Sequence, residues 1–131
     1  DLINEVGGIE EGVGKIINGG PMMGKALKNT EVPVTKGTSG ILMISAEETS
    51  RKEVNNCLRC GECIDACPMG LEPFLLMNYA EKGLFESAVK EAVLTCVECG
   101  SCSYVCPSNR PLLEYIRYGK INAIKLENAK K

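Results

Sequence analysis

The sequence predicts an α+β protein with two parts, a partial small β segment over residues 1–45 and a mostly helical domain over residues 46–131. Two observations favour this division. The first part is dense in glycine, and its apolar residues form short runs separated by turn-forming residues, which is typical of strands. The second part contains all eight cysteines, and its apolar residues recur at helical spacing.

Short strands are expected at three apolar runs of the first part, "KII", "VPVT" and "ILMIS". The turns that separate them are expected at Gly19–Gly20, at Asn29–Thr30 and from Gly37 to Gly40. Ser45 and Glu48 then have the spacing of a capping box. A charged helix is therefore expected over about residues 46–55, leading into the first cysteine.

The segment between the two cysteine-rich stretches, residues 69–95, predicts two helices. Pro73 suits a first helical position and Gly83 suits a stop, and apolar pairs recur beyond Gly83 at steps of four. After the second stretch, Ser108 or Asn109 is expected to cap a last helix with Pro111 near its start. The apolar stripe of that helix is Leu112, Ile116, Gly119, Ala123 and Leu126. Its small residues would let another backbone approach closely.

The cysteines form two copies of one phrase, "CLRCGECIDACP" at 57–68 and "CVECGSCSYVCP" at 96–107. The spacing C-x2-C-x2-C-x3-C-P is that of bacterial iron–sulfur ligation, in which three cysteines hold one cluster and the fourth reaches the other. The sequence therefore predicts two [4Fe–4S] clusters. Cluster 1 would take Cys57, Cys60, Cys63 and Cys106, and cluster 2 would take Cys96, Cys99, Cys102 and Cys67. Gly61 and Gly100 follow the second cysteine of each phrase, where a positive φ is expected.

Two other fates of the cysteines compete with this interpretation. Disulfides are disfavoured because no secretion signal opens the sequence. Zinc would take Cys57, Cys60, Cys96 and Cys99, but the other four cysteines would then bind no metal or would need a second complete site. A zinc-stabilised interaction domain stays as an alternative of a different class.

Composition and motifs bear on the remaining functional classes. The net charge of −2 gives no sign of nucleic-acid binding, and no apolar run approaches the roughly 20 residues of a membrane span. Histidine is absent, and no catalytic residue is predicted. The motif from Gly19 to Lys25 meets most of the P-loop formula, but Ala26 replaces the hydroxyl that would bind magnesium. A glycine-rich turn is therefore preferred there, with nucleotide binding as the alternative.

The motifs "GGPMMG" and "VPVTKGTSGIL", followed by the two cysteine phrases, resemble the C subunits of Rnf ion-translocating ferredoxin:NAD oxidoreductases over about residues 15–118. The resemblance implies a peripheral subunit on the cytoplasmic face of the cell membrane, bound to other subunits of a membrane redox complex. It implies that residues 1–45 are part of a β-grasp ligand-binding-like domain. The cysteine-rich part would be a helical ferredoxin-type module with two [4Fe–4S] clusters.

The resemblance also implies an oxidoreductase and translocase complex whose FMN and NAD(H) bind in a domain that precedes residue 1. The chain begins at Asp1, so a fragment of a longer protein is expected, and by itself it would lack a complete catalytic site. Its expected function is electron transfer between the flavin site and other subunits. An iron–sulfur subunit of another redox complex, of the heterodisulfide reductase or dehydrogenase type, is the alternative.

Overall fold

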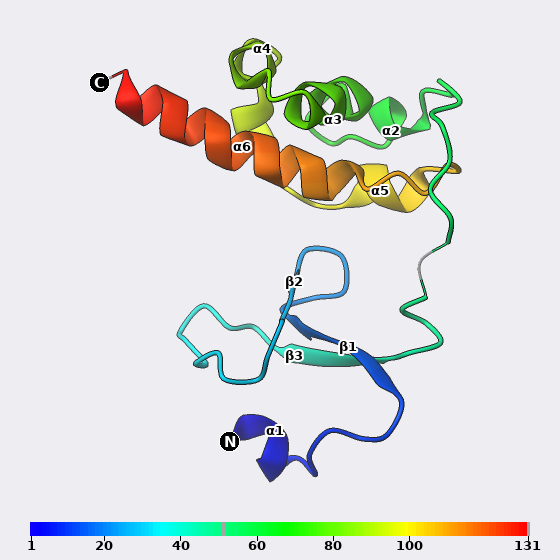
Figure 1. Cartoon of the computed structure of the whole chain (residues 1–131), viewed down its shortest axis with the longest axis vertical. Coiled ribbons are helices and arrows are strands. Elements are labelled where there is room, and N and C mark those ends of the chain that lie inside the picture. The colour runs from blue at the N-terminus through cyan, green and yellow to red at the C-terminus, as the bar shows by residue number, and fades with distance from the viewer. Residues whose placement is uncertain (51, 131) are drawn as a thin grey trace. The chain divides into compact units, whose positions relative to one another are not determined.

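The computed structural model describes residues 1–50 and 52–130 and shows an α+β protein, as the sequence predicts (Figure 1). It divides into a sheet unit, residues 1–51, and a cysteine unit, residues 52–131. The sheet unit contains α1 (Leu2–Glu5), β1 (Val13–Asn18), β2 (Lys25–Ala26) and β3 (Ile41–Ser45). The cysteine unit contains α2 (Glu62–Asp65), α3 (Pro73–Glu81), α4 (Phe85–Lys90), the 3₁₀ helix η1 (Val93–Thr95), α5 (Ser101–Val105) and α6 (Leu112–Ala129).

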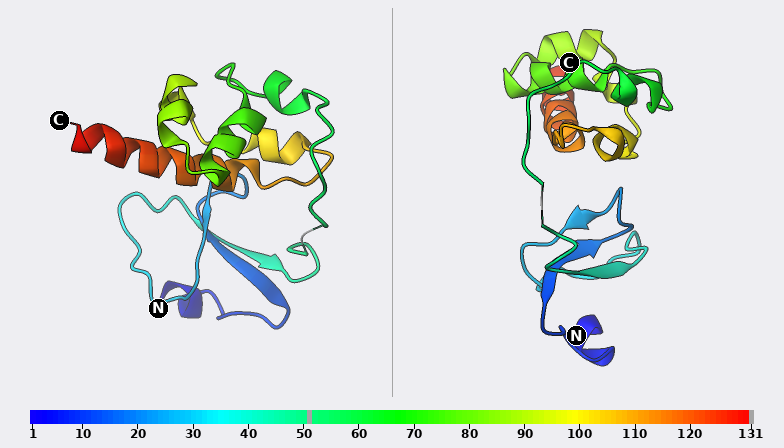
Figure 2. Two further views of the ribbon diagram at one scale, coloured as in Figure 1. Left: turned by 45° about the horizontal axis from the view of Figure 1, so that its top comes forward. Right: turned by 90° about the vertical axis from the view of Figure 1, so that its right-hand side faces the viewer.

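The sheet unit is built on a three-stranded antiparallel sheet in the order β2-β1-β3 (Figure 2). β1 pairs with β3 from Asn18 opposite Ile41 to Val13 opposite Ser45. The strands predicted at "KII" and "ILMIS" are therefore confirmed. The strand predicted at "VPVT", residues 32–35, is wrong, and β2 takes its place in the sheet. Pro33 lacks the N–H that a ladder needs, which is a physical reason for its segment to stay outside.

The turn between β1 and β2 accounts for the glycines of the P-loop-like motif. Gly19 has a φ of 108°, and the N–H of Gly24 donates to the carbonyl oxygen of Gly20 at 2.8 Å. A Cβ at Gly24 would collide with that carbonyl and with the side chain of Ile17. Lys25 then begins a strand, whereas a P-loop leads into a helix. The glycines are explained by the close packing of this turn.

The helix predicted over residues 46–55 is wrong; residue 51 lies outside the described residues. The hydroxyl of Ser45 does accept a hydrogen bond from the N–H of Glu48 at 3.3 Å, as a capping box requires. The chain nevertheless makes only one turn there, and residues 52–61 have no regular secondary structure. The Thr49 hydroxyl donates to the carbonyl of Ala46 at 3.1 Å, a local bond of the kind that competes with helix propagation.

The core of the cysteine unit lies where α3, α4 and α6 pack together. Its buried residues are Leu71, Leu76, Met77, Ala88, Val93, Cys102, Leu112, Ile116 and Ala123. The predicted stripe of α6 is confirmed, with only Leu126 half-buried. The predicted stop after α3 is also confirmed, because Gly83 has a φ of 69°. No helix within residues 1–50 and 52–130 combines the length and apolar character of a membrane span.

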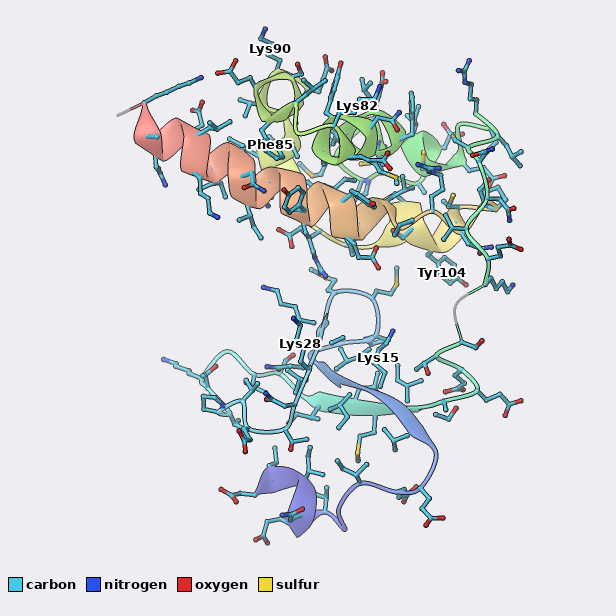
Figure 3. The ribbon with its side chains drawn as sticks, viewed as in Figure 1. Lys15, Lys28, Lys82, Phe85, Lys90 and Tyr104 are labelled. Carbon is cyan, nitrogen blue, oxygen red and sulfur yellow. The ribbon has the colours of Figure 1, made fainter. Side chains whose placement is uncertain are left out.

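Two contacts fix α6 beside its neighbours. A Cβ on Gly119 would lie only 3.0 Å from the Cβ of Ala80, so α3 and α6 approach as closely as the predicted small residue allows. Phe85 of α4 is labelled in Figure 3. Its ring meets that of Tyr118 of α6 edge to face, with ring centroids 5.7 Å apart and an interplanar angle of 71°. These contacts hold α6 against α3 and α4.

Candidate metal centre

The two cysteine phrases fold into loops of the same shape, the first cysteine loop (residues 57–63) and the second cysteine loop (residues 96–102). Arg59 and Glu98, at equivalent positions, both have left-handed backbone with φ of 56° and 57°. The N–H of each donates to the sulfur of the first cysteine in its own loop at 3.4 Å. Gly61 and Gly100, with φ of 87° and 86° as predicted, then lead into α2 and α5. The sequence repeat is therefore a structural repeat.

Hydrogen bonds hold the segment before the first cysteine loop against the residues that directly follow the second phrase. They run from the Ser108 hydroxyl to the Asn56 carbonyl at 2.9 Å, from the Asn109 amide group to the Glu53 carbonyl at 3.2 Å, and from the Asn55 N–H to the Ser108 carbonyl at 3.0 Å. The predicted capping role of Ser108 and Asn109 is wrong, because Pro111 holds the N-cap position of α6 without a side-chain hydrogen bond. Both residues instead keep the chain at Cys106 beside the first loop.

The first cysteine loop and Cys106 form the first group of four cysteines. Burial raises the pKa of Cys63, and the negative charges of Cys106, Cys57 and Cys60 raise it further, so these sulfurs lie near one another. The backbone N–H of Phe74, in the first turn of α3, bonds to Cys63 and opposes this rise. Cys57 and Cys60 are exposed, whereas the other two are half-buried. These are the four cysteines predicted for cluster 1.

The second group of four cysteines lines a cavity of the cysteine unit. Cys67, Cys96, Cys99 and Cys102 contribute to its wall, and these are the four predicted for cluster 2. Apolar side chains complete the lining, among them Met69, Leu71, Leu76, Leu113 and Ile116. Burial raises the pKa of Cys102 to about 11. Burial is also the main cause that raises the pKa of Cys96. The cysteines of the second group are therefore more buried from solvent than those of the first group.

Charged side chains of α6 reach the second cysteine loop. Lys120 Nζ donates to the carbonyl oxygen of Cys96 at 2.7 Å and to Glu98 Oε1 at 3.2 Å. Arg117 Nε donates to Glu98 Oε2 at 3.0 Å. Burial alone would raise the pKa of Glu98, but the bonds from Lys120 and Arg117 outweigh it and hold this pKa below its usual value. Sequence reasoning missed both cations, since nothing in their spacing points to a loop about twenty residues away.

A polar neighbour also distinguishes Cys99 within the second group. Its sulfur lies 3.4 Å from the Ser101 hydroxyl oxygen, and this hydrogen bond is the main cause that lowers the pKa of the thiol. Such bonds stabilise the thiolate, which is the form that binds metal. The first loop has Glu62 at the position equivalent to Ser101, so the two loops differ in side chains although their backbones agree.

The eight cysteines fit two iron–sulfur clusters in kind and in grouping. Thiolates are the ligands of such clusters, and each group takes three sulfurs from one phrase and one from the other. Within residues 1–50 and 52–130, no three cysteine, histidine or carboxylate side chains converge on the position of a single metal ion. The thiolates of a cubane bind different irons, so a cluster does not require that convergence.

Comparison with known proteins supports the same chemistry. A family model described as a 4Fe-4S dicluster domain matches residues 49–107. The C subunit of the proton-translocating ferredoxin:NAD(+) oxidoreductase complex of Clostridium ljungdahlii is 48% identical over 121 residues, which are 92% of this chain and 26% of that protein. The C subunit of the ion-translocating oxidoreductase complex of Rhodobacter capsulatus is 47% identical over 120 residues, 92% of this chain and 23% of that protein.

A third relative belongs to a complex named for a different ion. The C subunit of the Na(+)-translocating ferredoxin:NAD(+) oxidoreductase complex of Acetobacterium woodii is 42% identical over 119 residues, 91% of this chain and 27% of that protein. The chain thus spans about a quarter of the length of the curated relatives it matches. Over the part that it spans, this chain belongs to the family of ion-translocating ferredoxin:NAD oxidoreductase (Rnf) C subunits.

Proposed function

We propose that this chain transfers single electrons through two [4Fe–4S] clusters in the C subunit of an ion-translocating ferredoxin:NAD oxidoreductase. One observation supports the proposal most. Each cysteine group is assembled crosswise, with three sulfurs from one loop and the fourth from the other phrase. This crossing is what the spacing of two-cluster ferredoxins requires.

The residues have distinct parts in this proposal. Cys57, Cys60, Cys63 and Cys106 would hold cluster 1, and Cys96, Cys99, Cys102 and Cys67 would hold cluster 2. Bound clusters supply one-electron redox chemistry. The two left-handed loops aim backbone N–H groups at the sulfurs, and the apolar lining of the second group keeps water away. No proton needs to move for a single electron to pass, so the chain needs no catalytic acid or base.

The proposal extends to the whole subunit through its relatives. FMN and NAD(H) would bind to a part of the C subunit outside residues 1–131, and the clusters would connect that flavin site to other subunits. The subunit would lie on the cytoplasmic face of the membrane as a peripheral member of the complex. Residues 1–45 would be part of a β-grasp-like domain and residues 46–131 a ferredoxin-type domain. The names of the relatives, which describe subunits of ion-translocating complexes, support the assignment to such a complex.

Metal and sulfide analysis of the chain, prepared without oxygen, tests the proposal. Two [4Fe–4S] clusters correspond to about eight iron and eight acid-labile sulfide per chain. Electron paramagnetic resonance (EPR) of the reduced protein should show two interacting S = 1/2 centres. A colourless protein that contains zinc and no sulfide would overturn the proposal in favour of a zinc-stabilised domain.

A further inference from the structure

The two groups of cysteines differ in their access to solvent. In the first cysteine loop, Cys57 and Cys60 are exposed, and Leu58 between them is 71% exposed. At the equivalent place in the second loop, Val97 is 48% exposed, and its neighbouring cysteines are half-buried. Electron transfer between proteins weakens steeply with distance. The first group is therefore the one that a partner's cofactor can approach most closely.

The backbone of the first cysteine loop keeps the Leu58 side chain from becoming buried in the core of the cysteine unit. It stands between two cysteines of a short loop whose next residue, Arg59, has left-handed backbone, and the Arg59 N–H is bound to the Cys57 sulfur. An exposed leucine in so constrained a loop offers apolar contact area at little further cost in conformational entropy. Small contacts of this kind are typical of transient redox encounters.

The exposed charges around this loop give a small net negative charge. From residue 52 to residue 65 there are three carboxylates, Glu53, Glu62 and Asp65, against two cations, Lys52 and Arg59, a net charge of −1. A bound oxidised cluster with four thiolates adds about −2 more. Within the described part of the chain, neither Glu62 nor Asp65 forms an ion pair. The second loop differs, since its single carboxylate Glu98 is bound by two cations of α6.

We infer that Cys57, Leu58, Cys60, Glu62 and Asp65 form a docking surface for a redox protein whose exposed cofactor edge is rimmed by lysines or arginines. This inference rests on the proposed function. Leu58 packs against the apolar cofactor edge, and the carboxylates attract the basic rim. One electron then leaves the chain and reduces one acceptor centre, and no proton is transferred.

Reduction of cytochrome c tests this docking surface. Cytochrome c has an exposed haem edge surrounded by lysines, and its ferric haem takes up one electron. The cluster-loaded full chain, reduced in advance, is mixed with ferric cytochrome c in a stopped-flow instrument over a range of ionic strengths. The second-order rate constant should fall steeply as salt rises, since opposite charges steer the encounter. Lysine-acetylated cytochrome c should react more slowly at low salt and depend less on salt.

Variants locate the contact. Leu58→Lys should slow the reaction about tenfold or more, because it sets a cation against the basic rim. Leu84→Lys places the same change at an exposed leucine between α3 and α4 and should change the rate less than about twofold. Glu62→Gln with Asp65→Asn keeps every cysteine and Leu58 and removes only the two negative charges, so it should slow the reaction at low salt only.

The outcomes separate this inference from the proposed function. If the chain contains no iron and sulfide, the proposed function fails and the inference fails with it. If loaded and reduced chains react equally fast with and without the Leu58 and carboxylate substitutions, electron transfer stands and the docking surface is refuted. Should Leu58→Lys prevent cluster loading, the carboxylate variant and acetylated cytochrome c decide the question.

Discussion

Lys120 of α6 places its ammonium nitrogen 2.7 Å from the carbonyl oxygen of Cys96, in the second cysteine loop. Lys120 and Arg117, both about four-fifths buried, also bind Glu98, so two cations surround one carboxylate at this loop. The positive charge of Lys120 lowers the pKa of Cys96 against the dominant effect of burial. The same charge would stabilise the additional electron of a reduced cluster 2.

Replacement of Lys120 should therefore lower the reduction potential of one cluster. We expect Lys120→Met to lower it by about 40 mV, since an effect on the order of 1 kcal/mol is reasonable for a partly screened charge. A redox titration followed by EPR measures both potentials. Lys120→Arg keeps the positive charge, so it should leave this reduction potential close to that of the unsubstituted chain.

Lys130 provides the matched control for this charge. Its Nζ binds Glu86 at 2.9 Å on the exposed surface and touches neither cysteine loop. Lys130→Met also removes one positive charge from the cysteine unit, but at a place away from both cysteine loops. It should therefore leave both reduction potentials nearly unchanged. Equal shifts in the two variants would mean that only the overall charge of the unit matters, and the specific role of Lys120 would be refuted.

The sequence predicts those features that depend on local spacing. The loops at Gly61 and Gly100, the start of α3 at Pro73 and the buried stripe of α6 follow from patterns within about a dozen residues. The repeated cysteine spacing also indicates the crossed grouping of the two phrases. Other features that depend on how distant segments meet were not predictable. Ser108 has the chemistry of a helix cap, yet it bonds to Asn56 because the first loop folds back to it. Likewise, Lys120 reaches Cys96 only because α6 packs in one particular register.

Close packing of α6 against α3 can be tested at Gly119. Gly119→Leu should lower the thermal unfolding midpoint by several degrees, corresponding to about 1–3 kcal/mol, because its side chain would press on Ala80. Circular dichroism at 222 nm follows the loss of helix. Lys125→Leu inserts the same side chain on the exposed side of α6 and should have little effect. Adding Ala80→Gly to Gly119→Leu should restore part of the lost thermal stability. If the unfolding midpoint did not rise, contact with Ala80 of α3 would not be the cause of the destabilisation.

Removal of iron should affect the two units differently. All eight cysteines belong to the cysteine unit, where the clusters would link loops that otherwise share few hydrogen bonds. Anaerobic chelation should therefore speed amide hydrogen exchange in residues 57–70 and 96–108. The strands Val13–Asn18 and Ile41–Ser45 should keep their exchange rates, since they contain no ligand. Iron-saturated chelator serves as the control, and unchanged exchange in both cysteine loops would contradict a structural role of the clusters.

The pairing of the cysteines gives the most direct test of the crossed arrangement. Cys106 stands in the second phrase but groups with the first loop, and Cys67 stands in the first phrase but lines the cavity of the second group. Cys106→Ser should therefore alter the same EPR signal as Cys57→Ser, and Cys67→Ser should alter the same signal as Cys96→Ser.

An arrangement in which each phrase holds its own cluster predicts the opposite pairing. Cys67→Ser would then resemble Cys57→Ser, and Cys106→Ser would resemble Cys96→Ser. Serine keeps the size of the side chain but is a weaker iron ligand, so each variant perturbs one cluster with little change in packing. The neighbouring variant Ser108→Ala provides the control for loop damage, because it removes the bond to Asn56 while leaving every sulfur in place. If Ser108→Ala altered the signal as strongly as Cys106→Ser, the Cys106 result would reflect a displaced loop instead of a lost ligand.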